Sequence, residues 1–349
     1  MTNPSPLSSS SQLAGPSQSA GSGTRAPSHA GVLRAAGKMA ALLPPTPLLP
    51  LELPSGEMIW CKAESLQPVG AFKIRGAWHR LSDMTAEERA RGVVAVSSGN
   101  HAQGVAWSAA RLGIAATIVM PSNAPRVKLD ATRAMGAEIV LYDRARESRD
   151  AIAAGLIAQS GAILVHAYGD PWVIEGQGSA GIELAAQMEL AAQMAGRAGG
   201  APSRIVCPCG GGGLAAGLAI AVPGAQVVPV EPEHWDDVTR SLASGTIEGV
   251  ARDAPATACD ALQTPATFPI NFAVLRAHGM AGVVVTEAET RAAQRLAFDR
   301  LHLVIEPGGA VALAAVMTGK VPADGRTAVI LSGGNVDRAA FARVIAGDD

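Results

Sequence analysis

The sequence is poor in aromatic residues and has almost no net charge. Phe, Trp and Tyr make up 3% of its 349 residues, and 28 Lys and Arg stand against 30 Asp and Glu, a formal net charge of -2. Proteins dedicated to nucleic acid or anionic membranes usually carry a basic excess. The composition therefore predicts no nucleic-acid partner and no membrane partner.

Cysteines and long hydrophobic runs are also scarce. The cysteines, Cys61, Cys207, Cys209 and Cys259, form no C-x-x-C pair, so they predict reduced thiols in a cytoplasmic protein rather than a disulfide framework. The apolar run 39–54 contains five prolines and cannot form a membrane-spanning helix. No apolar signal segment is visible near the start, which agrees with a cytoplasmic location.

The length and the pattern of apolar segments predict an α/β protein of about two domains. Short apolar runs alternate with Ala-rich helical stretches, which is typical of mostly parallel, twisted sheets flanked by helices. We expect residues 1–30, rich in Ser, Pro and Gly, to be a disordered tail. We expect residues 31–85 and 171–349 to form a large domain, into which a small α/β domain, residues 86–170, is inserted.

A run of glycines, 210–213, lies between an apolar strand and an Ala-rich helix. Consecutive glycines let backbone N–H groups surround an anion, and the helix N-terminus adds a favourable dipole. The run predicts a phosphate-binding loop at the carboxyl end of a strand, where α/β proteins bind ligands. The stretch also fits the pattern G-x-G-x-x-[GA], with Glu231 about 20 residues on, so a nicotinamide-dependent oxidoreductase is an alternative.

Three further loops place polar residues at the boundaries of predicted elements. Lys73, in the segment GAFKIRGA, begins a helix, where its charge is unfavourable; a lysine joined to a carbonyl group loses that charge and becomes a covalent catalyst. The segment SSGNH at 97–101 suits a carboxylate or a phenolic oxygen at a helix N-terminus. The segment SGGN at 332–335 follows another strand. Taken singly, each is also typical of an ordinary turn or surface residue.

Together these segments resemble the fold-type-II enzymes that use pyridoxal phosphate, in particular the serine/threonine dehydratase family, which includes threonine ammonia-lyases, serine racemases and hydroxyaspartate dehydratases. The shared motifs are GAFKIRGA, SSGNHAQG, GQGS, GGGGL, EPGGA and SGGN, in the family's order. The resemblance runs from about Thr46 to Asp337. It outweighs the dinucleotide alternative, and it implies a two-domain fold like that of the tryptophan synthase β chain, with the cofactor in the large domain.

The resemblance also implies a role for each matching residue. Lys73 would bind pyridoxal phosphate covalently and, when released, remove the Cα proton of the substrate. Ser98 would lie on the opposite face, where a racemase exchanges the second proton. The implied catalytic residues are Lys73 and Ser98; the implied cofactor-binding residues are Phe72, Lys73, Asn100, Gly210, Gly211, Gly212, Gly213, Leu214, Glu306 and Ser332; and the implied substrate-binding residues are Ser97, Asn100, His101 and Arg149.

A divalent cation is implied in the same way. The segment EPEHWDD at 231–237 resembles the cation loop of serine racemases, which implies Glu231, the carbonyl oxygen of Trp235 and Asp237 as ligands. Such an all-oxygen set suits Mg²⁺, Mn²⁺ or Ca²⁺. The plain alternative is an acidic start of a helix, which is favourable without any metal.

We therefore predict a pyridoxal-phosphate dehydratase that deaminates L-threonine, and also L-serine, to a 2-oxo acid and ammonia. The alternatives within the family are a serine racemase and a 3-hydroxyaspartate dehydratase; an acidic substrate would need an additional cation that the sequence alone does not locate. A cofactor-binding relative without turnover is a further alternative. Because related enzymes are dimers or tetramers, we expect a homodimer or homotetramer.

Overall fold

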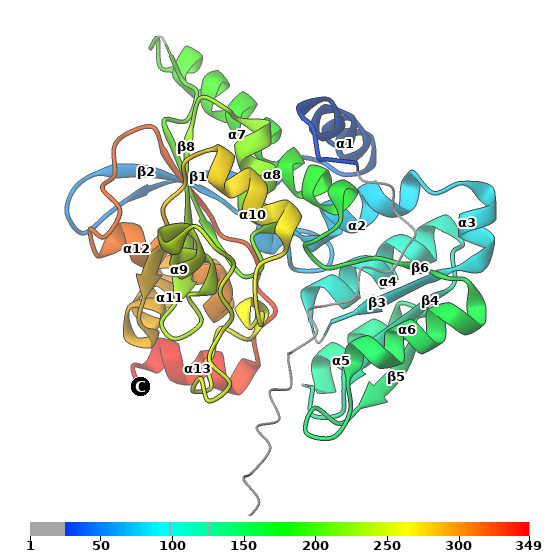
Figure 1. The fold of residues 1–349 in the computed structure, drawn as a ribbon. Helices are drawn as coiled ribbons and strands as arrows, with labels where there is room; N and C mark the ends of the chain where they lie inside the picture. Colours follow the sequence, from blue (N-terminus) through cyan, green and yellow to red (C-terminus); the bar gives the residue numbers. More distant parts are fainter. Residues whose placement is uncertain (1–24, 98, 125, 198, 349) are drawn as a thin grey trace, which may run out of the picture.

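The strands form two separate sheets in the computed structural model, which describes residues 25–97, 99–124, 126–197 and 199–348 (Figure 1). The strands are β1 (Leu48–Glu52), β2 (Met58–Lys62), β3 (Val93–Val96), β4 (Ala116–Pro121), β5 (Glu138–Tyr142), β6 (Ile163–Leu164), β7 (Arg204–Pro208), β8 (Gln226–Pro232), β9 (Val283–Val285) and β10 (Thr327–Ile330). The large sheet has the order β1-β2-β10-β7-β8-β9 and is parallel except for β1; the small sheet, β5-β4-β3-β6, is wholly parallel.

Helices connect and flank these strands. They are α1 (His29–Leu42), α2 (Lys73–Ser82), α3 (Ala86–Arg91), α4 (Asn100–Leu112), α5 (Arg126–Ala134), α6 (Arg149–Ser160), α7 (Pro171–Met194), α8 (Gly213–Ala221), α9 (Asp237–Ser244), α10 (Pro269–Ala277), α11 (Glu287–Leu301), α12 (Pro307–Met317) and α13 (Arg338–Ala346), with short 3₁₀ turns η1 (Glu64–Leu66) and η2 (Asp260–Leu262). The predicted α/β fold with mostly parallel sheets is confirmed. None of the helices in the described part of the chain combines the length and apolar character needed to cross a bilayer.

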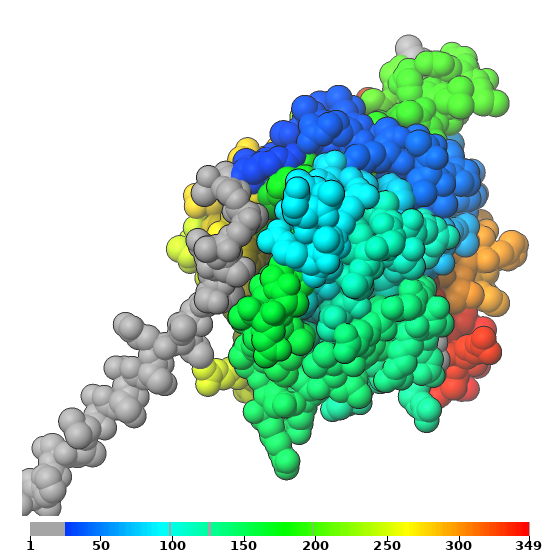
Figure 2. Space-filling view, turned by 90° about the vertical axis from the view of Figure 1, so that its right-hand side faces the viewer, coloured from blue at the N-terminus to red at the C-terminus, as the bar shows by residue number. Residues whose placement is uncertain are grey.

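The small sheet and the helices α3 to α6 lie within residues 86–170, the range predicted for an inserted domain. In the space-filling view this part, in cyan to green, makes up much of one face, with α1 in blue above it (Figure 2). The division of the chain into domains at these residues stays a prediction.

The N-terminal part differs from the prediction at two places. Residues 25–30, assigned to a tail, belong to the fold, because Arg25 donates two hydrogen bonds of 2.6 Å to Glu175 and α1 begins at His29. Residues 1–24 lie outside the described residues. Strand β1 lies in the proline-broken run 39–54, and Pro50 is tolerated there because β1 is an edge strand.

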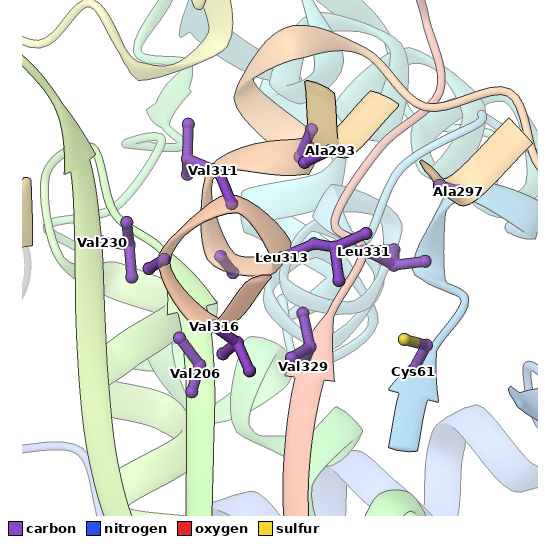
Figure 3. Close-up of a cluster of buried hydrophobic side chains, with 14 of the residues drawn as sticks. Cys61, Val206, Val230, Ala293, Ala297, Val311, Leu313, Val316, Val329 and Leu331 are labelled. Carbon is purple, nitrogen blue, oxygen red and sulfur yellow. The ribbon is translucent and has the colours of Figure 1, made fainter. Parts of the chain in front are cut away.

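Helix α12 packs on the large sheet and forms much of the core beneath the candidate site (Figure 3). Each large aliphatic side chain buried there contributes about 1.5–3 kcal/mol of transfer free energy. Since Glu306 is the N-cap of α12, this core also fixes the position of Glu306. The side chains that meet between α12 and strands β7, β8 and β10 are Val206, Val230, Val311, Leu313, Val316 and Val329.

Candidate functional site

Loops from distant parts of the chain meet at the start of helix α2. The Phe72 N–H donates a 3.0 Å hydrogen bond to the carbonyl of Ser332, and the Glu306 N–H donates a 3.0 Å bond to the carbonyl of Gly333. Buried backbone groups must find such partners, so these bonds fix the relative position of the loops. The segment that ends at Lys73 is thereby tied to the loop after β10 and to the start of α12, as the resemblance implied.

The Lys73 amine lies within this junction. Its Nζ donates a 2.8 Å hydrogen bond to the carbonyl of Ala167 and lies 5.1 Å from the centre of the Phe72 ring. Among the described residues, no carboxylate forms an ion pair with it, and burial lowers its pKa from 10.5 to about 8. A lysine in this state can bind a carbonyl compound or remove a proton near neutral pH.

Asn100, Glu306 and Asn335 form a chain of hydrogen bonds beside Ser332. Asn100 Nδ2 donates to Glu306 Oε1 at 2.5 Å, and Asn335 Nδ2 donates to Asn100 Oδ1 at 2.9 Å. Burial raises the pKa of Glu306 to about 7, and its Oε2 has no hydrogen-bond partner in the described part of the chain. A buried polar atom without a partner is costly, so Oε2 is available to a ligand. Asn335, in the SGGN motif, was not identified from the sequence.

The glycine loop between β7 and α8 is anchored from the α10 side. The carbonyl of Gly211 accepts hydrogen bonds from Thr267 Oγ1 at 3.1 Å and from Asn271 Nδ2 at 2.6 Å. Gly212 has a φ of +87°, which side chains rarely adopt, and a Cβ on Gly211 would lie 2.2 Å from the Tyr168 ring. Helix α8 begins directly after Gly212, and its first N–H groups have no acceptor within the helix, so the loop suits an anion.

These features fit pyridoxal phosphate. The turn 166–169 bridges the two most informative elements, because its Ala167 carbonyl accepts from Lys73 while its Tyr168 ring covers Gly211. An amine that can bind an aldehyde is therefore one turn away from a loop that can bind a phosphate. The buried Oε2 of Glu306 adds a polar group still in need of a partner.

The predicted carboxylate site is only partly assembled as expected. Ser97 and Arg149 line the same small cavity of about 20 Å³. His101 Nε2 bonds to the carbonyl of Val165 at 2.8 Å, so Nε2 carries the hydrogen; burial and the charge of Lys73 lower the His101 pKa to about 3. The ring is thus neutral, and its free Nδ1 is an acceptor, which argues against a carboxylate-binding role. Ser98 lies outside the described residues, and its role stays a prediction.

Lys128, on α5, is a buried cation that the sequence analysis missed. Its Nζ pairs with Asp260 of η2 and lies 3.5 Å from the position that a Cβ on Gly99 would occupy. The pair links the helix layer of the small sheet to the large-sheet part of the chain. Nothing in the local sequence announces it, because the two residues are 132 positions apart.

The predicted cation loop has one occupied and one unpartnered carboxylate. Glu231 accepts from Val238 N, Thr239 N and Thr239 Oγ1 at 2.6–3.0 Å, so it caps α9, whereas both buried oxygens of Asp237 lack a partner among the described residues. Burial raises the pKa of Glu231 to about 8 and that of Asp237 to about 7. No group of three or more metal-ligating side chains occurs in the described residues. The predicted set, with the Trp235 carbonyl, needs only two, so the metal stays a prediction.

Comparisons with known proteins agree on one family. The profile described as "Pyridoxal-phosphate dependent enzyme" matches residues 40–333. L-threo-3-hydroxyaspartate ammonia-lyase of Saccharomyces cerevisiae is 36% identical over 93% of this chain and 98% of its own length. The solved structure of a bacterial-type threonine deaminase matches with a TM-score of 0.78 and 40% identity, covering 89% of this chain and 99% of that one. Maize serine racemase matches with a TM-score of 0.82 and 29% identity, covering 93% of this chain and 98% of that one.

Proposed function

The chain belongs to the family of pyridoxal-phosphate dependent enzymes, and we propose that it is an ammonia-lyase that dehydrates a 3-hydroxy amino acid, with L-threo-3-hydroxyaspartate as the preferred substrate. The observation that carries the lyase assignment is the convergence of the Lys73 amine, the glycine loop and the Asn100–Glu306 pair. Family membership also removes the nicotinamide-dependent alternative, since the glycine loop then receives the phosphate of pyridoxal phosphate.

Four groups of residues would hold the cofactor. Lys73 would bind it covalently, the loop 210–214 would receive its phosphate, and Asn100 and Ser332 would lie beside its ring, with Phe72 and Glu306 adjacent. Bound pyridoxal phosphate withdraws electrons from the bonds at the Cα of an attached amino acid. The chain then decides which of those bonds breaks.

The elimination follows from the position and basicity of one amine. Lys73 Nζ, with a pKa lowered to about 8 by burial, takes the Cα proton, and the hydroxyl on Cβ leaves as water once it is protonated. Water then replaces the amine, so the products are ammonia and a 2-oxo acid: oxaloacetate from 3-hydroxyaspartate, 2-oxobutanoate from threonine and pyruvate from serine. The Ala167 carbonyl keeps Nζ in place for this transfer.

Arg149 supports a substrate with a second carboxylate. It shares a cavity with Ser97, and its positive charge acts on His166 and Tyr168, which flank the partner of Lys73. In the described part of the chain, its ion pair is with its exposed neighbour Asp150, at 3.6 Å. Lys128, by contrast, is already paired with Asp260. The hydroxyaspartate activity of the yeast relative points to the same substrate.

Threonine and serine, preferred in the sequence analysis, are the competing substrates, in line with the threonine deaminase among the similar structures. Serine racemisation is the third activity, and it depends on Ser98. A cytoplasmic location and a homodimer or homotetramer are part of the proposal, carried over from the sequence.

The test compares kcat/KM of the cofactor-loaded protein for L-threo-3-hydroxyaspartate, L-threonine and L-serine, with the 2-oxo acid as readout. In Arg149→Gln, loss of a charge-assisted pair should raise KM for 3-hydroxyaspartate about 10- to 100-fold and leave that for threonine nearly unchanged. Arg146→Gln, an exposed neighbour, is the matched control. An equal loss for all substrates would place Arg149 at the α-carboxylate instead, and no turnover of any of them would refute the proposal.

A further inference from the structure

The turn between β6 and α7, residues 166–169, is built around one histidine. His166 Nδ1 accepts a 2.8 Å hydrogen bond from the Gly169 N–H and a longer one, 3.4 Å, from the Tyr168 N–H. Between them, the carbonyl of Ala167 is the acceptor for Lys73 Nζ. The histidine therefore shapes the loop that supplies the hydrogen-bond partner of the central amine.

We infer that His166 is a positioning residue for Lys73: its Nδ1, as a hydrogen-bond acceptor, holds the turn whose Ala167 carbonyl fixes the Lys73 amine. The inference rests on the proposed function, because it gives Lys73 the central role. It assigns His166 no contact with the substrate.

The ring is held in the orientation that this role requires. It makes an edge contact with Tyr168, with ring centres 4.6 Å apart, and a tilted contact with Phe268 at 4.9 Å. Burial, together with the positive charges of Arg149 and Lys73, lowers the pKa of His166 to about 4. The ring is therefore neutral at physiological pH, and Nδ1 keeps the lone pair that accepts both N–H groups.

The turn has little room to relax. A Cβ on Gly169 would lie 2.6 Å from the Phe268 ring and 3.0 Å from His166 Nδ1. Directly after the turn, Asp170 caps α7 by accepting from Trp172 N at 2.8 Å. A change in the turn would therefore be transmitted to its middle, where the Ala167 carbonyl lies.

The Tyr168 ring extends the consequence to the glycine loop. It packs so closely on Gly211 that a Cβ there would lie 2.2 Å away, and its hydroxyl donates to the carbonyl of Ala266 at 3.3 Å. One turn thus sets both the amine and the cover of the phosphate loop. A loss of the His166 acceptor should disturb the two together.

Two variants of His166 separate the acceptor from the ring. His166→Phe keeps an aromatic ring but has no acceptor, whereas His166→Asn supplies Oδ1, which commonly accepts from the N–H two residues on. A displacement of the amine by about 1 Å costs on the order of 100-fold in rate. We expect kcat of His166→Phe to fall about 10- to 100-fold with KM nearly unchanged, and His166→Asn to stay within a few-fold of the parent.

A second readout does not depend on turnover. In cofactor-free protein, the rate at which acetic anhydride labels Lys73, followed by peptide mass spectrometry across pH, gives the pKa of its amine. Because the Ala167 carbonyl favours the charged form, His166→Phe should lower that pKa by about 0.5 to 1, and His166→Asn should not. His278→Phe, at an exposed histidine, is the matched control.

The outcomes separate this inference from the proposed function. If the parent turns over no hydroxy amino acid, the proposed function fails, while the labelling of Lys73 still tests His166. If His166→Phe keeps the parent's Lys73 pKa, or His166→Asn loses as much as His166→Phe, the positioning role is wrong. Since His166→Asn is expected to retain function, a misfolded phenylalanine variant does not protect the inference.

Discussion

Replacing Arg75 by methionine should strongly destabilise the protein, because it removes the main cation from a buried charge network. The Arg75 side chain is 1% exposed; its Nε and Nη2 each donate a 2.7 Å hydrogen bond to Glu64, and Nη2 donates a 3.0 Å bond to Glu183. Burial alone would raise the pKa of Glu64, but the charge and hydrogen bonds of Arg75 lower it overall. Lys62, which pairs with Glu183, would be the remaining cation of this network.

The magnitude follows from what is left behind. Removing one partner of a buried ion pair costs about 3–5 kcal/mol, since an uncompensated charge stays in the interior. With an unfolding entropy of about 2.1 cal/mol/K per residue, a chain of this length has roughly 0.7 kcal/mol/K, so Tm should fall by about 4–7 °C. Replacing Glu64 by glutamine in the same protein removes the orphaned charge and leaves Lys62 and Glu183 paired. The double variant should therefore be more stable than Arg75→Met alone.

Thermal and urea unfolding of the single and double variants at neutral pH would measure these differences. Arg133→Met is the control, because Arg133 pairs with Asp130 on the surface at 51% side-chain exposure, where an ion pair contributes about 0–1 kcal/mol. The reasoning is refuted if Arg75→Met lowers Tm no more than Arg133→Met does. It is also refuted if the double variant is as unstable as the single one.

Two further predictions concern acid and the glycine loop. Burial lowers the pKa of His101 to about 3 and that of His166 to about 4, so the stability held by their neutral forms is present above pH ~6.5 and is lost as pH falls towards 4. The urea midpoint should therefore drop between about pH 6.5 and pH 4.5, and a constant midpoint would contradict this. Gly211→Ala places a Cβ against the Tyr168 ring and should weaken pyridoxal-phosphate binding about 10-fold in an absorbance titration. The control Gly224→Ala, where a Cβ meets nothing within 4 Å, should bind like the parent.

Much of the candidate site can be predicted from local sequence, because its parts lie at recognisable boundaries between strands and helices. The glycine run, Lys73 and Asn100 each follow a turn and begin or precede a helix, and a parallel sheet brings the carboxyl ends of its strands to one edge. The motif EPGGA likewise places Glu306 at the start of α12. Residue type and spacing were sufficient for these positions.

The same local signals failed where the environment overrides propensity. The prolines of run 39–54 argued against regular structure, yet β1 forms there, since an edge strand does not need every N–H for the sheet. Residues 25–30 resemble the polar tail before them, but the buried Glu175 carboxylate binds Arg25 and holds them on the fold. In both cases the deciding partner is distant in the sequence.

Local sequence specifies the alternation of strands and helices, the glycine loop, the reactive lysine and, through these, the family. Which polar atoms pair is set by the packing of the folded chain: Lys73 with Ala167 across 94 positions, Lys128 with Asp260 across 132, and Asn100 with Asn335 across 235. Secondary structure follows from short-range backbone and side-chain preferences, whereas a buried hydrogen bond forms only when two groups come within about 3 Å of each other. For groups so far apart in sequence, that approach depends on the whole chain.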